Sequence, residues 1–76
     1  RGVWCAVWLH ETGDNEFKIS FRSGDEINVN ELAEKFGGGG HKRASGATLF
    51  GTLEECTERI MKELSNMIEF SDKPEN

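Results

Sequence analysis

Four consecutive glycines stand directly before three basic side chains in the segment FGGGGHKRASG, residues 36–46. Glycine lacks a Cβ and adopts positive φ without strain, so a run of glycines lets successive backbone N–H groups converge on an anion. A histidine at the mouth of such a nest can donate a hydrogen bond to a phosphate oxygen. The segment therefore indicates an anion site, at which His41 and the free N–H groups of a helical turn over residues 41–45 would face the ligand.

The main alternative for the glycine run is a flexible linker. A linker joins domains, whereas this run lies inside one short domain, between a predicted helix and a predicted strand that must pack together. Two known phosphate motifs do not match. The phosphate loop of nucleotide hydrolases needs glycine before its lysine and Ser or Thr after it, but Lys42 stands between His41 and Arg43. The dinucleotide fingerprint needs G-x-G-x-x-G after a strand, and the glycine run does not fit that pattern.

Small residues follow the basic cluster: Ala44, Ser45 and Gly46. They would let the chain approach a ligand closely, and plain packing explains them equally well. A metal site is not indicated, because His41 has no second ligand nearby in the sequence. Cys5 and Cys56 lie far apart and belong to no set with metal-ligand spacing, so we expect two buried free thiols in a reducing compartment.

Length and charge narrow the class of protein. The chain has 76 residues and a formal net charge of −5 at pH 7, so it should form one domain without a broad basic face. A local phosphate site is compatible with an acidic protein, because exposed charges more than about 8 Å apart are largely screened at physiological salt. No apolar run approaches the roughly 18 residues of a membrane span, and no charged-then-apolar leader opens the sequence. We expect a cytoplasmic protein, and the start at Arg1 suggests a piece of a longer chain.

Alternating side chains predict a β-hairpin that positions Arg22. Residues 3–10 are apolar on both alternating faces, which is typical of a strand covered on two sides. In residues 16–23, apolar side chains at positions 17, 19 and 21 alternate with Lys18, Ser20 and Arg22. Because a slip of one residue would carry the apolar set into water, the register is fixed and Arg22 points in a defined direction at a strand end.

Two capped helices complete a predicted α+β fold. Asn28 and Glu31 suit the start of a short helix that ends at the glycines, and Thr52 with Glu55 suits the start of a second helix. Apolar residues recur there at spacings of three and four, which makes the second helix long and amphipathic: Leu53, Cys56, Ile60, Leu64, Met67 and Ile68. With a strand over residues 47–50, we expect a small sheet of about three strands, both helices, and a glycine-rich loop with its helical turn.

The segment GGGGHKRASG resembles the G-G-G-H-x-x-A-[A/S]-G signature of the C-terminal, substrate-binding (DHH-associated) domain of DHH-family phosphoesterases. SFRS, residues 20–23, is similar to the strand-end S-x-R-S of the nano-RNase and 3′-phosphoadenosine 5′-phosphate phosphatase branch. The order of elements also matches from about residue 3 to residue 68. The resemblance therefore implies one domain over residues 1–70, taken from a longer chain, with residues 71–76 as a disordered tail.

The resemblance also implies which residues meet a substrate. Side chains that contact its phosphate or terminal nucleotide, and the backbone that approaches it, would be Arg22, Gly38, Gly39, Gly40, His41 and Ser45. The candidate helpers are Ser23, Lys42 and Arg43. In the family, a separate N-terminal domain holds two Mn²⁺ ions through aspartates and an Asp-His-His motif, and metal-activated water cleaves the phosphoester. This chain has no Asp-His-His, so we expect no catalytic residue and no cofactor in it, and no activity from it alone.

The sequence thus predicts the substrate-binding domain of a manganese-dependent DHH-family phosphoesterase. Its partners would be a short oligoribonucleotide or phosphonucleotide, the catalytic domain, and a second copy in a homodimer. We expect no interaction with a membrane. One alternative is a stand-alone nucleic-acid-binding module, but this needs exposed aromatic rings, and Trp4 and Trp8 lie on the strand predicted to be covered on two sides. The other alternative is a dimerisation domain without a ligand, in which the glycines only turn the chain.

Overall fold

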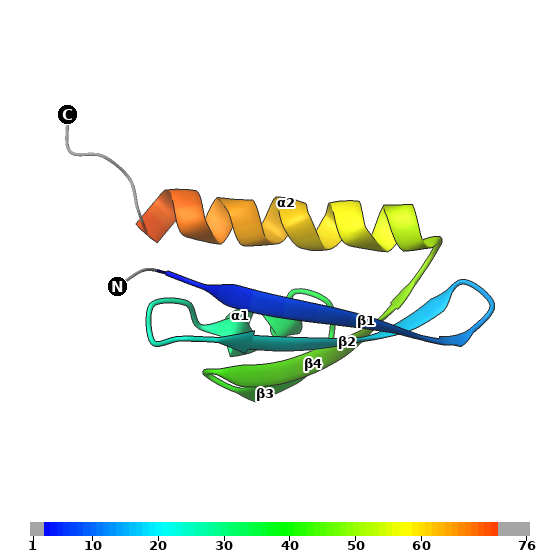
Figure 1. Cartoon of the computed structure of the whole chain (residues 1–76), viewed down its shortest axis with the longest axis horizontal. Coiled ribbons are helices and arrows are strands. Elements are labelled where there is room, and N and C mark those ends of the chain that lie inside the picture. The colour runs from blue at the N-terminus through cyan, green and yellow to red at the C-terminus, as the bar shows by residue number, and fades with distance from the viewer. Residues whose placement is uncertain (1–2, 72–76) are drawn as a thin grey trace.

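The structure is a computed structural model that describes residues 3–71. These residues form, in chain order, the elements β1 (Cys5–Gly13), β2 (Glu16–Ser23), α1 (Val29–Glu34), β3 (Gly39–His41), β4 (Ala44–Phe50) and α2 (Leu53–Ser71). The strands make one antiparallel sheet in the order β1-β2-β4-β3, and α2 runs along its length (Figure 1). The sheet register shifts between Glu11 and Gly13, near the β1–β2 turn. The predicted α+β class is confirmed.

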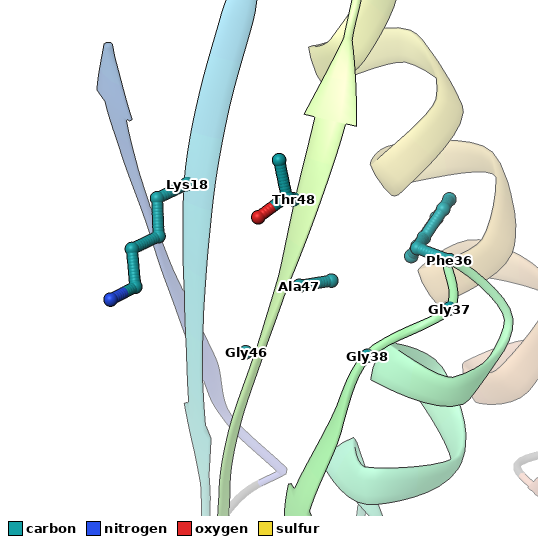
Figure 2. Close-up of a pocket in the computed structure, with 7 residues that line it drawn as sticks. All are labelled: Lys18, Phe36, Gly37, Gly38, Gly46, Ala47 and Thr48. Carbon is teal, nitrogen blue, oxygen red and sulfur yellow. The ribbon is translucent and has the colours of Figure 1, made fainter. Parts of the chain in front are cut away.

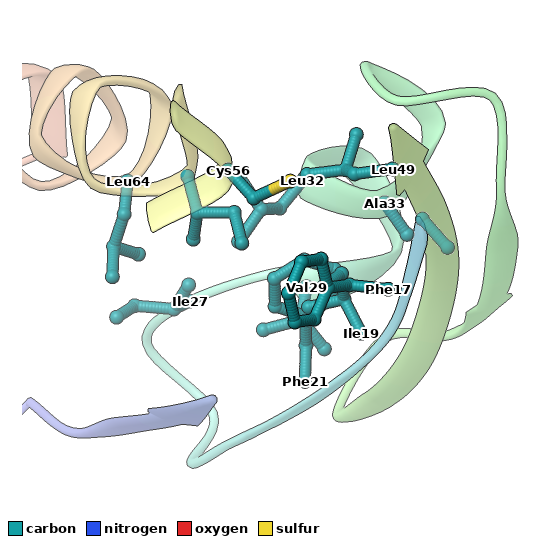
Figure 3. Packing of buried hydrophobic residues seen from close by; sticks show 12 residues of the cluster. Phe17, Ile19, Phe21, Ile27, Val29, Leu32, Ala33, Leu49, Cys56 and Leu64 are labelled. Atoms are coloured by element: carbon teal, nitrogen blue, oxygen red, sulfur yellow. The ribbon is translucent and has the colours of Figure 1, made fainter. Parts of the chain in front are cut away.

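Both helices cover the same face of the sheet. The buried apolar side chains come from alternate positions of β2 and β4, from one side of each helix and from the β2–α1 connection (Figure 3): Phe17, Ile19, Phe21, Ala47 and Leu49 from the sheet, Val29, Leu32, Ala33, Cys56, Ile60 and Leu64 from the helices, and Ile27 from the connection. α2 also meets the segment that follows α1, because the Arg59 guanidinium lies 5.7 Å from the centre of the Phe36 ring. The opposite face of the sheet, called the open face below, carries no helix among residues 3–71.

Several local predictions hold in detail. β2 spans the predicted residues 16–23, and its apolar set is buried. The Asn28 side chain accepts hydrogen bonds from the N–H groups of Asn30 and Glu31, at 3.0 and 3.2 Å. At the start of α2, the Glu55 carboxylate accepts from the Thr52 N–H at 2.9 Å, and the Thr52 hydroxyl accepts from the Glu55 N–H at 3.1 Å. Both helices therefore begin where their caps predict.

The predicted helical turn over residues 41–45 is wrong. His41 ends β3, Lys42 and Arg43 form a turn, and β4 begins at Ala44. The sheet therefore has four strands and not about three, and the strand predicted over residues 47–50 begins earlier, at Ala44. Extended backbone is favoured over a helical turn here because residues 39–41 pair with β4, and because the carbonyls of the following turn accept hydrogen bonds from other parts of the chain. The Lys42 carbonyl accepts from the Val29 N–H at 2.8 Å, and the Arg43 carbonyl accepts from the Ser23 N–H at 3.1 Å.

The prediction that the first strand is covered on two sides is also wrong. β1 lies at the edge of the sheet, and Trp4 and Trp8 are 54 % and 57 % exposed. An indole counts as apolar in a sequence pattern, yet it is large enough to stay half in water. Leu53, expected in the core, is likewise 54 % exposed, because it stands at the first position of α2, where the helix extends beyond the core.

The two thiols are free, as predicted. Cys56 is buried, whereas Cys5 is only half-buried, and burial raises the pKa of the Cys5 thiol above its ordinary value. Of the predicted tail, Ser71 is the last residue of α2, and residues 72–76 lie outside the described residues. Within residues 3–71, neither helix combines the length and apolar character that crossing a membrane requires.

Candidate functional site

Arg22 and His41 lie in one row across the open face. In the sheet register, Arg22 of β2 pairs with Ala6 of β1 and with Ala44 of β4, and Ala44 pairs in turn with His41 of β3. Paired residues project from the same face, and strands are about 4.8 Å apart, so the Arg22 and His41 backbones are separated by about 10 Å. Only methyl groups stand beside the guanidinium in this row, so both long side chains can reach an anion between them.

Neither of the two basic side chains is engaged within the described structure. Arg22 and His41 are exposed, and no hydrogen bond, ion pair or ring contact involves their side chains in residues 3–71. Other cations have partners: Arg43 Nη1 lies 3.0 Å from Asp25 Oδ1, and Lys35 Nζ lies 3.9 Å from Glu63 Oε1. Arg22 and His41 are therefore free to bind a ligand.

The glycines help to position this row of side chains. Gly37, with φ of 83°, ends α1, where its N–H donates to the Glu34 carbonyl and the Gly38 N–H donates to the Ala33 carbonyl. A Cβ on Gly38 would lie 2.1 Å from the Gly46 carbonyl oxygen, and one on Gly40 would lie 2.6 Å from the Ser45 Cα. These two glycines thus let β3 approach β4 closely, and this places His41 on the edge strand of the sheet.

Gly39 differs from its neighbours. A Cβ there would meet only Asn30 Oδ1, at 3.7 Å, so packing does not require a glycine at this position. In the sheet register, Gly39 of β3 pairs with Gly46 of β4. Gly46 pairs in turn with Ser20 of β2, and Ser20 pairs with Trp8 of β1. A strip of very small residues therefore runs beside the Arg22 row and ends at an exposed indole.

A cavity of about 440 Å³ opens next to this strip, where β3 leaves β4 (Figure 2). Its lining consists of the α1–β3 connection and the adjoining strands: Lys18, Phe36, Gly37, Gly38, Gly46, Ala47 and Thr48. Lys18 and Thr48 face each other in the register, and Figure 2 shows the Lys18 side chain leaving β2 on the side away from Phe36.

Ser45, which was predicted to meet the substrate, and Ser23, a candidate helper, both make hydrogen bonds within the fold. The Ser45 hydroxyl donates to the Val29 carbonyl at 2.6 Å, which ties β4 to α1. The Ser23 side chain is buried and its hydroxyl lies 2.7 Å from the Ile27 carbonyl oxygen. Lys42 is exposed on the β3–β4 turn, and Arg43 pairs with Asp25. The side chains brought together on the open face are therefore those of Arg22 and His41.

Sequence reasoning missed Lys18 and Trp8 as members of this surface. The signal for Lys18 was present, because the alternation of β2 already placed it on the same face as Arg22. The signal for Trp8 was hidden by the apolar character of β1. His10 and Lys18 lie on the same face as Arg22 and His41, and on β2 the two cations Lys18 and Arg22 outnumber the one carboxylate of that face, Glu16, although the chain carries a net charge of −5. Within residues 3–71, no group of three or more His, Cys, Asp or Glu side chains could hold a metal ion.

Comparison with known proteins gives a consistent family. Residues 1–69 match the DHHA1 domain. The chain is 53 % identical over 62 residues to the bifunctional oligoribonuclease and PAP phosphatase NrnA of Mycoplasma pneumoniae, covering 71 % of this chain and 19 % of that protein. It is 37 % identical over 66 residues to the Bacillus subtilis protein of the same description, covering 87 % and 20 %. The chain thus spans about a fifth of the length of these curated relatives.

A solved structure shares the fold as well. The chain superposes on an exopolyphosphatase-related protein from Bacteroides fragilis with a TM-score of 0.67 and 36 % identity, covering 75 % of this chain and 17 % of the other.

Proposed function

Since the chain belongs to the DHHA1 domain family, we propose that it is the substrate-binding domain of a phosphoesterase that acts on short oligoribonucleotides or phosphorylated nucleotides. The observation that carries the proposal is the row on the open face. Two basic side chains that have no partner within residues 3–71, Arg22 and His41, flank Ala44 on one exposed surface. Names of relatives describe those proteins as acting on oligoribonucleotides and on PAP, which are both substrates with phosphate groups.

The proposed contribution of this surface is positioning. A guanidinium offers two parallel N–H donors that match two phosphate oxygens, and an imidazole adds a third donor from the other side. Held on a sheet, both groups keep their places when the ligand arrives. Fixing a phosphate relative to reacting groups elsewhere lowers the barrier to its hydrolysis, because the orientation has already been achieved on binding.

The described residues do not fit a catalytic metal centre, since no suitable cluster of ligands exists among them. We therefore derive no chemical step from this chain, and we expect no hydrolysis from it alone. The hydrolytic groups, including the two Mn²⁺ ions that the sequence resemblance implies, would belong to a separate catalytic domain. Such a protein would work in the cytoplasm, where free thiols such as Cys5 and Cys56 persist.

A stand-alone nucleic-acid-binding module is the second candidate function. The sequence pattern predicted that Trp4 and Trp8 are covered, but both are exposed, and this exposure favours the module. Binding of single strands with little sequence preference uses exposed aromatic rings. A dimerisation domain without ligand is the third, and it requires that Arg22 and His41 have no ligand to bind.

The test is an NMR titration of the isotope-labelled chain with a 5′-phosphorylated diribonucleotide. We expect chemical-shift changes at Arg22 and over residues 37–46, and their loss in a His41→Ala variant. The matched control is His10→Ala, which removes an exposed imidazole from the same face of the sheet but in the row of Lys18, away from Arg22 and His41, so the chemical-shift changes at Arg22 and over residues 37–46 should remain. Binding that survives both His41→Ala and Arg22→Gln would contradict the proposal.

A further inference from the structure

We propose that Trp8 is a base-stacking residue, whose indole receives a nucleobase next to the phosphate held by Arg22 and His41. This inference rests on the proposed function and adds a second subsite to it. The second subsite selects nucleotides and short single strands over phosphate compounds without a base.

The position of Trp8 is the first observation. It lies midway along β1 and projects from the open face, where its side chain is 57 % exposed. No hydrogen bond or ring contact engages the indole in the described part of the chain. A ring of this size in water offers a flat apolar surface that a base can cover, with a polar edge that stays wet.

The surroundings of Trp8 are the second observation. Its row continues through a serine and two glycines, Ser20, Gly46 and Gly39. Within this row, no side chain larger than that of serine stands beside the indole to block a ring or a sugar lying across the strip. On the neighbouring row, Ala6 and Ala44 leave the same clearance around Arg22.

The spacing between the two subsites is the third observation. Ser20, the partner of Trp8, is two residues before Arg22 on β2, and residues in a strand rise about 3.4 Å each, so the rows are about 7 Å apart along the strands. Because neighbouring strands are about 4.8 Å apart, the Trp8 backbone lies about 8 Å from that of Arg22 and about 12 Å from that of Ala44. Lys18 lies the same distance beyond Ser20 on the other side. The indole is thus flanked along the sheet by Lys18 and Arg22, neither of which has an ion-pair partner within residues 3–71, and this arrangement suits one base with a phosphate on either side.

Stacking on one indole favours a class of ligand rather than one sequence. Every base presents a π face, so a single aromatic platform tolerates base identity. We therefore infer that the open face takes a short single strand, bound through the phosphate at Arg22 and His41 and the adjoining base at Trp8, with little preference among the four bases.

Tryptophan fluorescence tests this directly, because the chain contains two tryptophans and a Trp4→Phe variant leaves Trp8 as the only indole. In that variant, 5′-phosphorylated diadenylate should quench the fluorescence, with the same midpoint as the NMR shifts at His41. Ribose 5-phosphate, which has the phosphate but no base, should shift His41 and leave the fluorescence unchanged.

Affinity measurements in the same background separate stacking from general surface effects. Stacking contributes enough that Trp8→Leu should weaken diadenylate binding by about 5- to 150-fold, while leaving ribose 5-phosphate binding intact. Trp8→Phe should restore most of the affinity. The matched control is Phe50→Leu, which removes an aromatic ring that is 67 % exposed on the same face but lies at the far end of β4.

The outcomes distinguish this inference from the proposed function. Diadenylate that shifts His41 without quenching Trp8, or that binds Trp8→Leu as tightly as the unsubstituted residue, overturns the stacking role and leaves the phosphate grip standing. Equal losses in Trp8→Leu and Phe50→Leu also overturn it. If neither His41 nor Trp8 responds to diadenylate, both the stacking role and the proposed function are overturned for this chain.

Discussion

The side chains beside Arg22 matter as much as the guanidinium. Ala6 and Ala44 are its partners in the register, and each leaves open space that a larger side chain would fill. The alternation of residues 16–23 indicated the direction of Arg22, whereas the position of His41 depends on how the glycine run folds, which no local pattern indicated. A glycine carries no side chain, so residues 37–40 give no periodic signal from which strand or helix could be predicted.

Replacing Arg22 tests the residue that contributes most charge to this row. Arg22→Gln removes the paired donors, and since a hydrogen bond to a charged group contributes about 1.5–3 kcal/mol, we expect binding of a 5′-phosphorylated diribonucleotide to weaken about 10- to 150-fold by calorimetry. Arg43→Gln is the control, because that arginine already pairs with Asp25. Similar losses in the two variants would show that overall charge, and not the position of Arg22, governs binding.

At the scale of elements, β3 is the part of the fold that the sequence did not predict. Its three residues, Gly39–His41, are held in place from both sides: Gly38 and Gly40 pack closely on β4, and the turn carbonyls of Lys42 and Arg43 accept hydrogen bonds from α1 and the end of β2. These contacts join residues distant in sequence, which no local pattern encodes. β2, α1 and α2 were predictable because caps and alternation are local.

Adjacent glycines give a matched pair for testing how β3 is held. Gly38→Ala would place a Cβ 2.1 Å from the Gly46 carbonyl oxygen, so β3 must move away from β4, and we expect a loss of about 1–3 kcal/mol in the free energy of unfolding. Gly39→Ala has no neighbour closer than 3.7 Å and should change stability by no more than about 0.5 kcal/mol. Urea unfolding measures both, and equal effects would mean that close packing at position 38 is not what selects glycine.

For the whole molecule, the charge distribution is the property that separates the candidate functions. The chain is acidic, with a net charge of −5, and its open face holds a small group of basic side chains: His10, Lys18, Arg22 and His41. A surface of this size can neutralise only two or three phosphates, however long the strand offered to it. A module that coats single strands would need cations along its entire groove.

The salt dependence of binding measures that difference. For a single strand, the slope of log affinity against log salt concentration is about −0.7 per neutralised phosphate, so we expect a slope of about −1.4 to −2 for this chain. The slope should not steepen when a 5′-phosphorylated dinucleotide is replaced by an octanucleotide. A slope that grows with strand length would favour the stand-alone nucleic-acid-binding module over the proposed substrate-binding domain.

A run of glycines usually means a segment with many accessible conformations, yet here the run is stiff. Gly37 ends a helix in a defined motif, and Gly38 and Gly40 are pressed against β4, so the surface that carries His41 exists before any ligand arrives. A preformed surface has no loop to order, and the entropy lost on binding is correspondingly small. Association should then be a single kinetic step, with a rate that rises in proportion to ligand concentration and reaches no plateau.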